Sequence, residues 1–499
     1  MSVAEAGPSR DVSATGDPTP PTPDEPAAGK LAAQVALRIE AEIIRRGWPV
    51  GASLGSEPQL RERHGVSRSV LREAVRLVEH HQVARMRRGP GGGLFIAAPD
   101  AGPAARAMVI YLEYVGTSIE DLMQARRLLE PLAAALAAEH VTEDGIEELR
   151  RTLGAESAMT DEPGDRTVET LHVVLGELSA NPVLGLFIDV LTRLTGRYGR
   201  LSPATPGSAY RTARADARRR HAEIADVVIA GDAGRAEARM AEYLDAVAAW
   251  MSTHGQDHRA VTGPAALAQD APAPPAKLAE VVAGRVRDDI AATGWPVGSV
   301  IGSEADLLAR YGISRAVLRE AVRLLEYHSV ASMRRGPGGG LVVGAPDPQA
   351  SVETMALYLE YRAVGAADLL AVREAIELGM VTRVTDRHED PAVARRLGAA
   401  ARWPAAAPTD DRTTDDRTTA DQFHAELAEL AGNPVLTLFL RILTALWRRH
   451  ATVERIGSGS AAEVELVHQR IAEAVAAGDE GLARHRLRRH LAALTDWWH

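Results

Sequence analysis

A long internal repeat constrains this chain more than any other feature of its sequence. Residues 47–96 and 294–343 are identical at 34 of 50 positions without a gap. The offset of 247 residues still relates Arg126 to Arg373, and it becomes 252 only around the segments SANPVLGLF and AGNPVLTLF. Solenoid repeats are only about 20–50 residues long. The long offset therefore indicates a duplicated domain pair rather than a solenoid.

The composition agrees with several domains and excludes some classes of protein. A chain of 499 residues is too long for a single hydrophobic core. It has no cysteine, which excludes disulfides, iron–sulfur clusters and thiolate zinc sites. The N-terminal residues lack the apolar segment of a secretory signal, and no run approaches the roughly 20 apolar residues of a membrane helix. We therefore expect a cytoplasmic protein with no membrane contact.

Three segments interrupt the otherwise helical patterns. Residues 1–29 are rich in Pro, Ser and Gly and are predicted to be a disordered tail. Residues 254–276 have the composition of a linker between the copies, and residues 402–419 form a polar insertion in the second copy. The remainder has the 3.6-residue periodicity of amphipathic helices, so the predicted fold class is mainly α.

The first part of each copy predicts three helices followed by a β-hairpin. Ser56, with Gln59 three residues later, and Ser67 are the predicted N-caps of the second and third helices. The first helix has an apolar face of Leu31, Val35, Ile39 and Ile43. The third has an apolar face of Leu71, Ala74, Val75 and Val78. A strand, a Gly-Pro-Gly turn and a second strand follow around residues 83–97 and again around 330–344.

Three helices and a hairpin, with arginines on the outer face of the third helix, predict a winged helix-turn-helix that binds double-stranded DNA. Arginine forks match guanine edges in the major groove, and a glycine turn lets the hairpin approach a minor groove. The candidate DNA-binding residues in the first copy are Ser67, Arg68, Ser69, Arg72, Arg76, Arg87, Arg88 and Gly91. Those in the second copy are Ser314, Arg315, Arg319, Arg323, Arg334, Arg335 and Gly338. The alternative for any single arginine helix is a solvated surface.

The charge distribution favours the DNA-binding interpretation. Residues 54–96 carry a net charge of +4 and residues 301–343 carry +2. Since the whole chain carries −10, the rest of it carries −16. Basic charge is therefore concentrated in the segments that the motif assigns to DNA.

The motif GVSRSVLREAVRLVEHHQVARMRRGPGGGLFI resembles the GntR family of bacterial transcription regulators. The following helices resemble the FadR branch of that family, whose sensor is an all-helical FCD domain. The resemblance implies homodimeric binding to palindromic operators, which this chain would achieve as an intramolecular pseudo-dimer. Further dimerisation of the fused pair stays open. It also implies a DNA-contacting role for Arg68 and Arg72 and for Arg315 and Arg319.

The expected domains follow from the repeat and the resemblance. Each winged helix-turn-helix domain precedes an all-α, FCD-like helical bundle. The predicted order is a tail (1–29), winged helix-turn-helix 1 (30–100), sensor 1 (101–253), a linker (254–276), winged helix-turn-helix 2 (277–347) and sensor 2 (348–499). Ser69 in the first domain corresponds to Ala316 in the second, so we expect a nearly palindromic operator. Pro58 and Ala305 depart from the family, which often has arginine there.

The resemblance also implies a divalent metal site in the second sensor. FCD domains often hold a metal with one Asp and three His residues, and His424, His468 and His490 match the three histidine positions. Asp421 is the candidate fourth ligand, although it lies one residue nearer to His424 than the family pattern requires. Imidazole ligands suit Zn or Ni. The alternative is a set of hydrogen-bonded core histidines.

The first sensor matches the metal pattern less well, because its third histidine position holds Tyr243. In both sensors the arginine of the first helix, Arg126 or Arg373, is a candidate to bind the carboxylate of a small-molecule effector. The alternative is a structural ion pair with the glutamate four residues later, Glu130 or Glu377.

Two other functional classes were weighed against a ligand-responsive regulator. GntR proteins fused to aminotransferases need a cofactor lysine, but this chain has only Lys30 and Lys277, and each opens a DNA-binding unit. No phosphate-binding loop or nucleophile elbow is present either, so we expect no enzyme activity. The remaining alternative is an architectural or partner-binding DNA protein without a working effector site.

Overall fold

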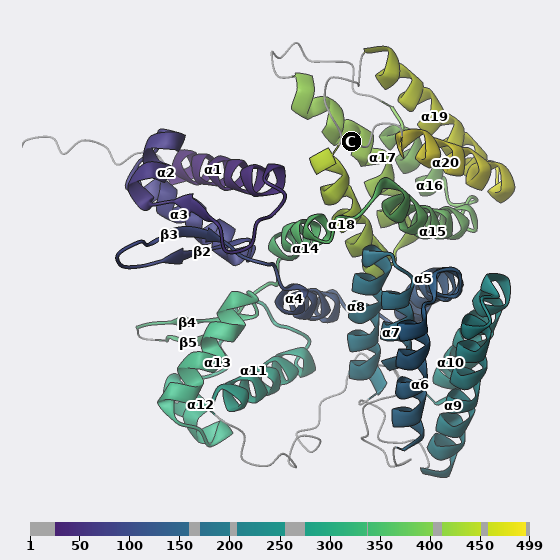
Figure 1. Cartoon of the computed structure of the whole chain (residues 1–499), viewed down its shortest axis with the longest axis horizontal. Coiled ribbons are helices and arrows are strands. Elements are labelled where there is room, and N and C mark those ends of the chain that lie inside the picture. Colours follow the sequence, from purple (N-terminus) through teal and green to yellow (C-terminus); the bar gives the residue numbers. More distant parts are fainter. Residues whose placement is uncertain are drawn as a thin grey trace, which may run out of the picture. The chain divides into compact units, whose positions relative to one another are not determined.

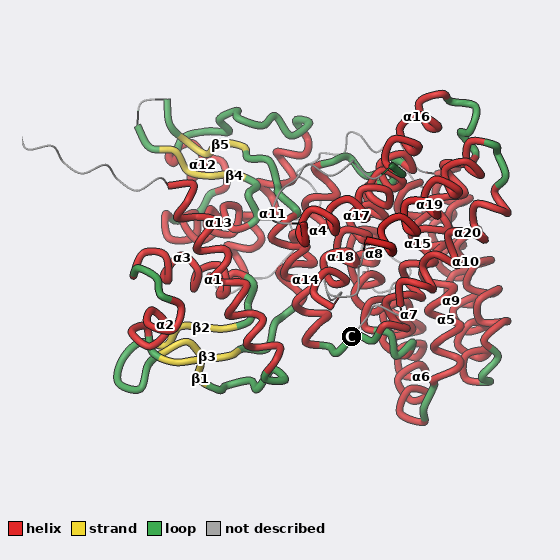
Figure 2. Tube along the Cα trace, turned by 90° about the horizontal axis from the view of Figure 1, so that it is seen from above, coloured by secondary structure: helices red, strands yellow, loops and turns green. Residues whose placement is uncertain are grey.

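The computed structural model describes residues 25–158, 170–199, 207–254, 275–336, 338–402, 412–450 and 458–495. They belong to two compact units, residues 1–98 and 99–499. Helices make up most of both units, and the strands are confined to two small antiparallel sheets (Figure 2). The predicted fold class is confirmed: two winged helix-turn-helix domains, each followed by a helical bundle.

The first unit contains a complete winged helix-turn-helix domain, which we call reader 1. Its elements are α1 (Glu25–Arg45), β1 (Ser53–Gly55), α2 (Glu57–His64), α3 (Arg68–His80), β2 (Ala84–Arg87) and β3 (Gly93–Ile96). Strand β3 lies between β1 and β2, and both pairings are antiparallel. The sequence predicted the β2–β3 hairpin but not β1, because three residues are too few to show a strand periodicity.

The core of reader 1 follows the predicted apolar faces with one exception. The predicted face of α3 is buried throughout, and Val35, Ile39 and Ile43 of α1 are fully buried. Leu31 is 39% exposed instead, and Ala32 takes the buried position beside it. Helix α1 begins at Glu25, so the predicted disordered tail was too long at its C-terminal end. Residues 1–24 of that tail lie outside the described residues.

The second winged helix-turn-helix domain, reader 2, repeats this arrangement within the second unit. Its elements are α11 (Pro275–Ala292), α12 (Glu304–Tyr311), α13 (Arg315–Tyr327), β4 (Ala331–Arg334) and β5 (Gly340–Val343). The third strand is reduced to a single bridge between Val300 and Val342.

Reader 2 packs against α4 (Ala101–Tyr114), the first helix of sensor 1. Ile110 belongs to the same buried apolar cluster as the reader core, and the ring of Tyr114 meets that of Trp295 edge-on at 5.5 Å. Trp295 has a left-handed backbone (φ 54°), and its Nε1–H donates to the carbonyl of Gly344. A bulky residue rarely adopts that conformation, so tertiary contacts must hold it there.

Each sensor is an antiparallel array of helices. After α4, sensor 1 contains α5 (Ile119–His140), α6 (Glu143–Ser157), α7 (Thr170–Leu178), α8 (Pro182–Gly199), α9 (Gly207–Ile229) and α10 (Ala233–His254). Sensor 2 contains α14 (Gln349–Tyr361), α15 (Ala366–Thr385), α16 (Pro391–Ala400), α17 (Arg412–Ala431), α18 (Pro434–His450), α19 (Ser458–Ala476) and α20 (Glu480–Thr495). Helix α17 begins inside the predicted polar insertion. The interior of the predicted linker, residues 255–274, lies outside the described residues.

The two sensors meet through α5, α8, α15 and α18, which share one apolar core (Figure 1). Phe187 of α8 stacks on Phe439 of α18 with ring centroids 3.9 Å apart. The Asn181 side-chain amide donates to the Asp368 carbonyl in the other sensor at 3.0 Å. Asn433 makes the reciprocal bond to the carbonyl of Asp121, also at 3.0 Å.

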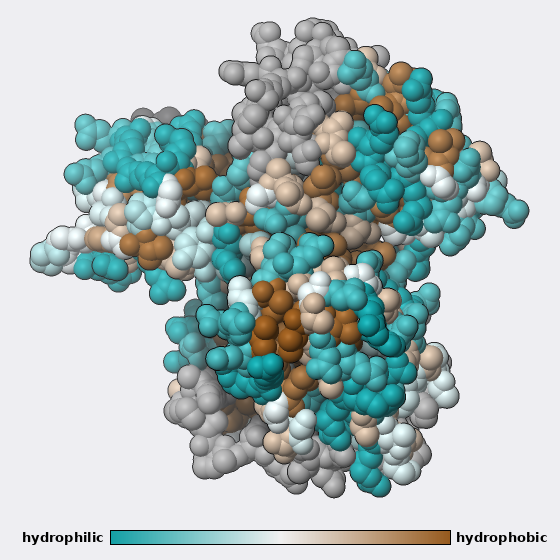
Figure 3. All heavy atoms as spheres, turned by 45° about the vertical axis from the view of Figure 1, so that its right-hand side comes forward, coloured by the Kyte–Doolittle hydropathy of each residue, from teal (hydrophilic) through white to brown (hydrophobic). Residues whose placement is uncertain are grey.

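The surface carries few large apolar side chains. Figure 3 shows hydrophilic residues over most of the face that it presents, with apolar residues in separate patches. None of the described helices combines the length and the hydropathy that a membrane span requires.

Candidate nucleic-acid interface and histidine cluster

The N-termini of the two recognition helices, α3 and α13, are fixed by serine caps. The Ser67 hydroxyl accepts a hydrogen bond from the Val70 amide at 3.3 Å, and Ser314 repeats this with Val317 at 3.4 Å. All fifteen predicted DNA-binding residues are solvent-exposed, and they lie on or beside the recognition helices and the hairpins. The buried opposite face of each helix anchors it to the reader core.

A glutamate on α2 orients the first arginines of the recognition helix, which the sequence did not predict. The Arg68 Nε–H donates to a Glu57 carboxylate oxygen at 2.7 Å, and the Arg72 guanidinium lies 3.6 Å from the same oxygen. The hydrogen bond from Arg68 is the main reason that the pKa of Glu57 is lowered. The equivalent pair in reader 2, Glu304 and Arg315, is looser at 3.6 Å.

The wing geometry requires glycine. Gly91 has a φ of +71°, and a Cβ on Gly92 would lie 2.5 Å from the carbonyl oxygen of Arg87. The Glu79 carboxylate on α3 accepts a hydrogen bond from the Met86 amide at 2.8 Å, and reader 2 repeats this bond at 3.1 Å. Each wing is therefore tied directly to its recognition helix.

Three buried histidines of sensor 2 converge on one point. The Nε2 atoms of His468 and His490 lie 3.0 Å apart, and those of His490 and His424 lie 3.3 Å apart. Two imidazole nitrogens bound about 2.0–2.1 Å from a tetrahedral zinc ion would lie roughly 3.3 Å apart. The donor set and its spacing therefore fit a divalent metal such as Zn or Ni.

A buried ion pair orients this histidine cluster. The Glu377 carboxylate contacts the His424 Nδ1 at 2.5 Å and accepts from the Arg373 Nε–H at 2.6 Å, so the His424 Nε2 faces the other histidines. Burial alone would raise the pKa of Glu377, but His424 and Arg373 outweigh it and lower this pKa to about 2. Burial, with His424 and Arg373 nearby, lowers the pKa of His490 to about 3. His490 is thus neutral at neutral pH, as a metal ligand must be.

The structure does not bring the fourth candidate ligand to this cluster. The Asp421 carboxylate accepts from the Arg448 Nε–H at 2.7 Å and is absent from the group of converging ligand atoms among the described residues. Asp421 lies three residues before His424, and one residue of offset along an α-helix turns its side chain by about 100° from the four-residue position. The sequence pattern is therefore met by three histidines without the acid.

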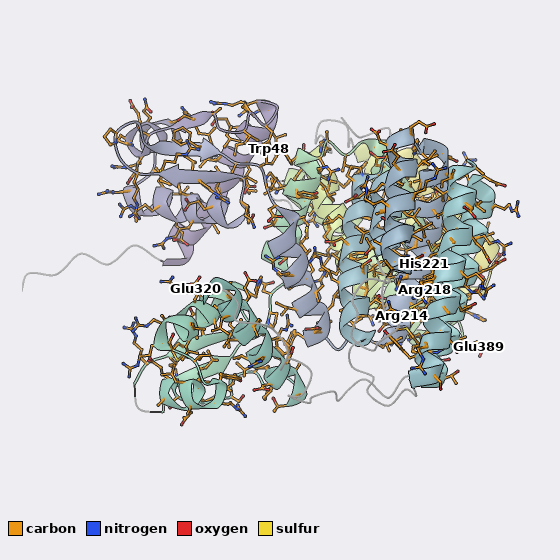
Figure 4. The ribbon with its side chains drawn as sticks, turned by 60° about the horizontal axis from the view of Figure 1, so that its bottom comes forward. Trp48, Arg214, Arg218, His221, Glu320 and Glu389 are labelled. Atoms are coloured by element: carbon orange, nitrogen blue, oxygen red, sulfur yellow. The ribbon has the colours of Figure 1, made fainter. Side chains whose placement is uncertain are left out.

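Sensor 1 replaces the metal-type cluster with a packed group of rings. The Tyr243 ring centroid lies 5.2 Å from that of His172 and 4.8 Å from that of His221. Both histidines direct Nδ1 toward a buried carboxylate, Glu130 at 2.7 Å and Glu156 at 2.9 Å respectively. His221 lies on α9 together with Arg214 and Arg218, which precede it along the helix (Figure 4). A phenol in place of the third imidazole makes this set a poor match for Zn or Ni.

The two candidate effector arginines have different surroundings. Arg126 is fully buried, with Nε 2.6 Å from one Glu130 oxygen and Nη2 3.3 Å from the other. Its Nη1–H donates to the hydroxyl of Thr195 at 3.1 Å. The structural ion pair considered from the sequence is therefore present in sensor 1.

Arg373 makes the matching bond to Glu377 through Nε, but its two Nη groups have no partner among the described residues. Trp447 occupies the position that Thr195 has in sensor 1. Arg373 and Trp447 line a small pocket with Ala366, Leu369, Leu370, Leu491 and Leu494. The pocket places an apolar wall beside the Arg373 guanidinium, and its free space is no larger than a water molecule.

Two protein-family models each match this chain in two places. The model for bacterial regulatory proteins of the gntR family matches residues 31–95 and 278–341, and the FCD domain model matches residues 121–246 and 368–493. Together these matches cover more than half of the chain. This chain belongs to the GntR family. The predicted resemblance, including the tandem arrangement of both domains, is confirmed.

Named relatives of this GntR-family chain are also transcription regulators rather than enzymes. It is 27% identical to the Uxu operon regulator of Haemophilus influenzae over 30% of its own length and 55% of the relative. It is 27% identical to the HTH-type transcriptional regulator LutR of Bacillus subtilis over 39% of its length and 89% of the relative. The HTH-type transcriptional repressor NanR of Escherichia coli is 25% identical over 46% of this chain and 86% of the relative.

Two solved structures also align with part of this chain. Streptococcus agalactiae GntR covers 43% of this chain at 23% identity with a TM-score of 0.33. Escherichia coli McbR/YncC covers 45% at 18% identity with a TM-score of 0.24. Like the curated relatives, each aligns with less than half of this chain.

Proposed function

We propose that this GntR-family regulator binds a nearly palindromic operator as a single-chain pseudo-dimer. In this proposal reader 1 and reader 2 each bind one half-site through the exposed residues of α3, α13 and the two wings. A small carboxylate, a divalent metal or both modulate DNA affinity from the helical domains.

The reciprocal contact between the sensors is the main observation that supports the pseudo-dimer proposal. In a two-fold symmetric interface, residue i contacts residue j while j of the partner contacts i. Asn181 with Asp368 and Asn433 with Asp121 repeat this relation within one polypeptide. The shared core and the Phe187–Phe439 stack lie in the same interface. A relative with one copy would need a second chain to form these contacts.

The contact between reader 2 and α4 supports coupling between sensing and DNA binding. Helix α4 is the first helix of sensor 1 and packs on α8 and α14 as well as on reader 2. Besides the Tyr114–Trp295 ring contact, the Arg287 guanidinium lies 3.6 Å from the Glu113 carboxylate. A shift of α4 by an ångström or two would therefore move reader 2 relative to its half-site.

Sensor 2 is the better candidate for ligand binding. His424, His468 and His490 would hold the metal, which would offer a Lewis-acidic position for an effector carboxylate when bound. The Arg373 guanidinium, linked to the cluster through Glu377, would bind a carboxylate within hydrogen-bonding reach of its Nη groups. Arg126 of sensor 1 is already engaged by Glu130 and Thr195.

The DNA-binding proposal is tested by selecting genomic fragments that the full chain binds and measuring stoichiometry on the selected duplex. We expect one chain per operator, with half-sites centred about one helical turn apart. Replacing Arg68 and Arg315 together by alanine should lower affinity by about 1–3 kcal/mol per half-site. Two chains per operator, or unchanged affinity of the double variant, would contradict the proposal.

A further inference from the structure

The two readers share their core and recognition-helix arginines but differ in exposed charge. Reader 1 has arginine at positions 61 and 85, where reader 2 has Leu308 and Ser332. Both arginines are exposed, and neither makes a hydrogen bond or salt bridge with a described residue. These two cations are available to an external anion in reader 1 alone.

Arg61 lies on the side of α2 that meets the start of the recognition helix. It follows Glu57 by four residues, so the two side chains share a helix face. Glu57 contacts both Arg68 and Arg72 of α3. Arg61 therefore adds a basic group beside the N-terminal end of α3, where Arg68 and Arg72 are the predicted base contacts.

Arg85 lies on the outer face of the wing. Along β2, Ala84 is buried and Met86 half-buried, whereas Arg85 and Arg87 are exposed. Arg85 is the register partner of Phe95 on β3, and the Arg87 guanidinium lies 4.3 Å above the Phe95 ring. Two exposed arginines on β2 make this face more basic than that of reader 2.

The matching face of the reader 2 wing carries half of this positive charge. Ser332 stands across from Val342, and Arg334 is the basic residue of the strand. The Arg334 Nη2–H donates to the carbonyl of Gly338 at the wing tip. The outer face of β4 therefore has one guanidinium group, whereas the outer face of β2 has two.

We propose that Arg61 and Arg85 are additional phosphate-contacting residues that make reader 1 the tighter half of the pseudo-dimer. This inference rests on the proposed DNA-binding function. One half-site of the operator is then bound strongly and the other weakly, although the recognition arginines of the two readers match. Each cation that neutralises a phosphate adds about 0.9 to the slope of log affinity against log salt concentration.

The test exchanges residues between the two readers in the full chain. Arg61→Leu with Arg85→Ser gives reader 1 the residues of reader 2. Leu308→Arg with Ser332→Arg makes the reverse change. On the selected duplex, we expect the first variant to bind on the order of tenfold more weakly, with a salt slope shallower by about 2. The second variant should bind more tightly, with a slope steeper by a similar amount.

Two controls separate the possible results. Arg235→Ser removes an exposed charge from α10 of sensor 1, so it reports the effect of net charge alone. Scrambling either half of the duplex should show that wild-type binding depends more on one half, and the exchange at positions 61 and 85 should remove that difference. If the wild-type chain binds no duplex, the proposed function fails. If it binds but neither exchange alters the salt slope beyond Arg235→Ser, this inference alone fails.

Discussion

Sensor 1 and sensor 2 place related side chains at the same positions and give them different surroundings. In sensor 1, Thr195 and Glu130 saturate Arg126, and Tyr243 packs where sensor 2 has a histidine. In sensor 2, the three histidine Nε2 atoms converge and Arg373 keeps its Nη groups beside a pocket. Two positions, 195/447 and 243/490, account for most of this difference. Very few substitutions in a duplicated domain are thus enough to replace a converging histidine cluster by packed rings.

The largest expected effect breaks the buried ion pair of sensor 1. Arg126→Met should destabilise the chain by about 3–5 kcal/mol, because it leaves the Glu130 charge buried with only His172 beside it. The pKa of Glu130 is lowered from 4.5 to about 2, chiefly by Arg126 acting against the opposing effect of burial. The stabilisation is therefore complete above about pH 4.5 and is lost as the pH falls toward 2.

Thermal melts of the wild type and Arg126→Met between pH 3 and 7 check this prediction. The difference in melting temperature should shrink as the solution becomes more acidic. A difference that stays constant with pH would show that the loss comes from packing rather than from the charge pair.

The next largest effect concerns metal affinity. His490→Tyr gives sensor 2 the residue of sensor 1 and should weaken Zn or Ni binding by at least about 100-fold, since a ligand matters no less than its hydrogen-bonding partners. The reverse change, Tyr243→His, should add a second, weaker site in sensor 1. Metal content after dialysis gives the number of bound ions per chain, and isothermal titration gives the affinity of each variant. If His490→Tyr binds as many metal ions per chain as the wild type, the metal binds elsewhere.

A smaller effect is expected at the Arg373 pocket. Trp447→Thr offers Arg373 the hydroxyl that Arg126 has in sensor 1, and Arg373→Met removes the guanidinium. Binding of acetate, succinate or citrate, followed by thermal shift, should weaken by about 1.5–3 kcal/mol in Arg373→Met and by less in Trp447→Thr. Arg126→Lys removes the guanidinium of sensor 1 while keeping its charge, and it should leave carboxylate binding unaltered. Equal losses in both sensors would remove the distinction between them.

The smallest effect tests the symmetry between the sensors. Asn181→Ala and Asn433→Ala each remove one reciprocal contact and two bonds that the side-chain carbonyl accepts at the start of α8 or α18. Asn433→Ala also removes a bond from the Asn433 amide to Gln124 Oε1 at 2.8 Å. Each should cost about 1–2 kcal/mol, with Asn433→Ala the more costly by the one extra hydrogen bond. Chemical denaturation of the two variants checks this. If the two variants lose very different amounts of unfolding free energy, the two halves of the interface do not contribute equally to stability.

Local patterns predicted the helices, the caps and the wings, because these depend on residues within a few positions of one another. The bond from the Ser56 amide to Gln59 at 2.8 Å and the buried face of α3 agree with that reading. The segments SANPVLGLF and AGNPVLTLF marked corresponding positions of the two copies, but nothing local indicated that each asparagine bonds the other sensor. Glu57 was missed for the same reason, since its partners lie on the next helix.

The sequence by itself determined the duplication, the mainly helical fold, the exposed arginines of both readers and the three matched histidines. Only the tertiary structure decided that Asp421 turns to Arg448, that Arg126 is saturated while Arg373 is open, and that reader 2 packs on α4. Helix formation is set by short-range periodicity. Which side chains meet across a bundle is set by how the helices cross, and that depends on the packing of the whole core.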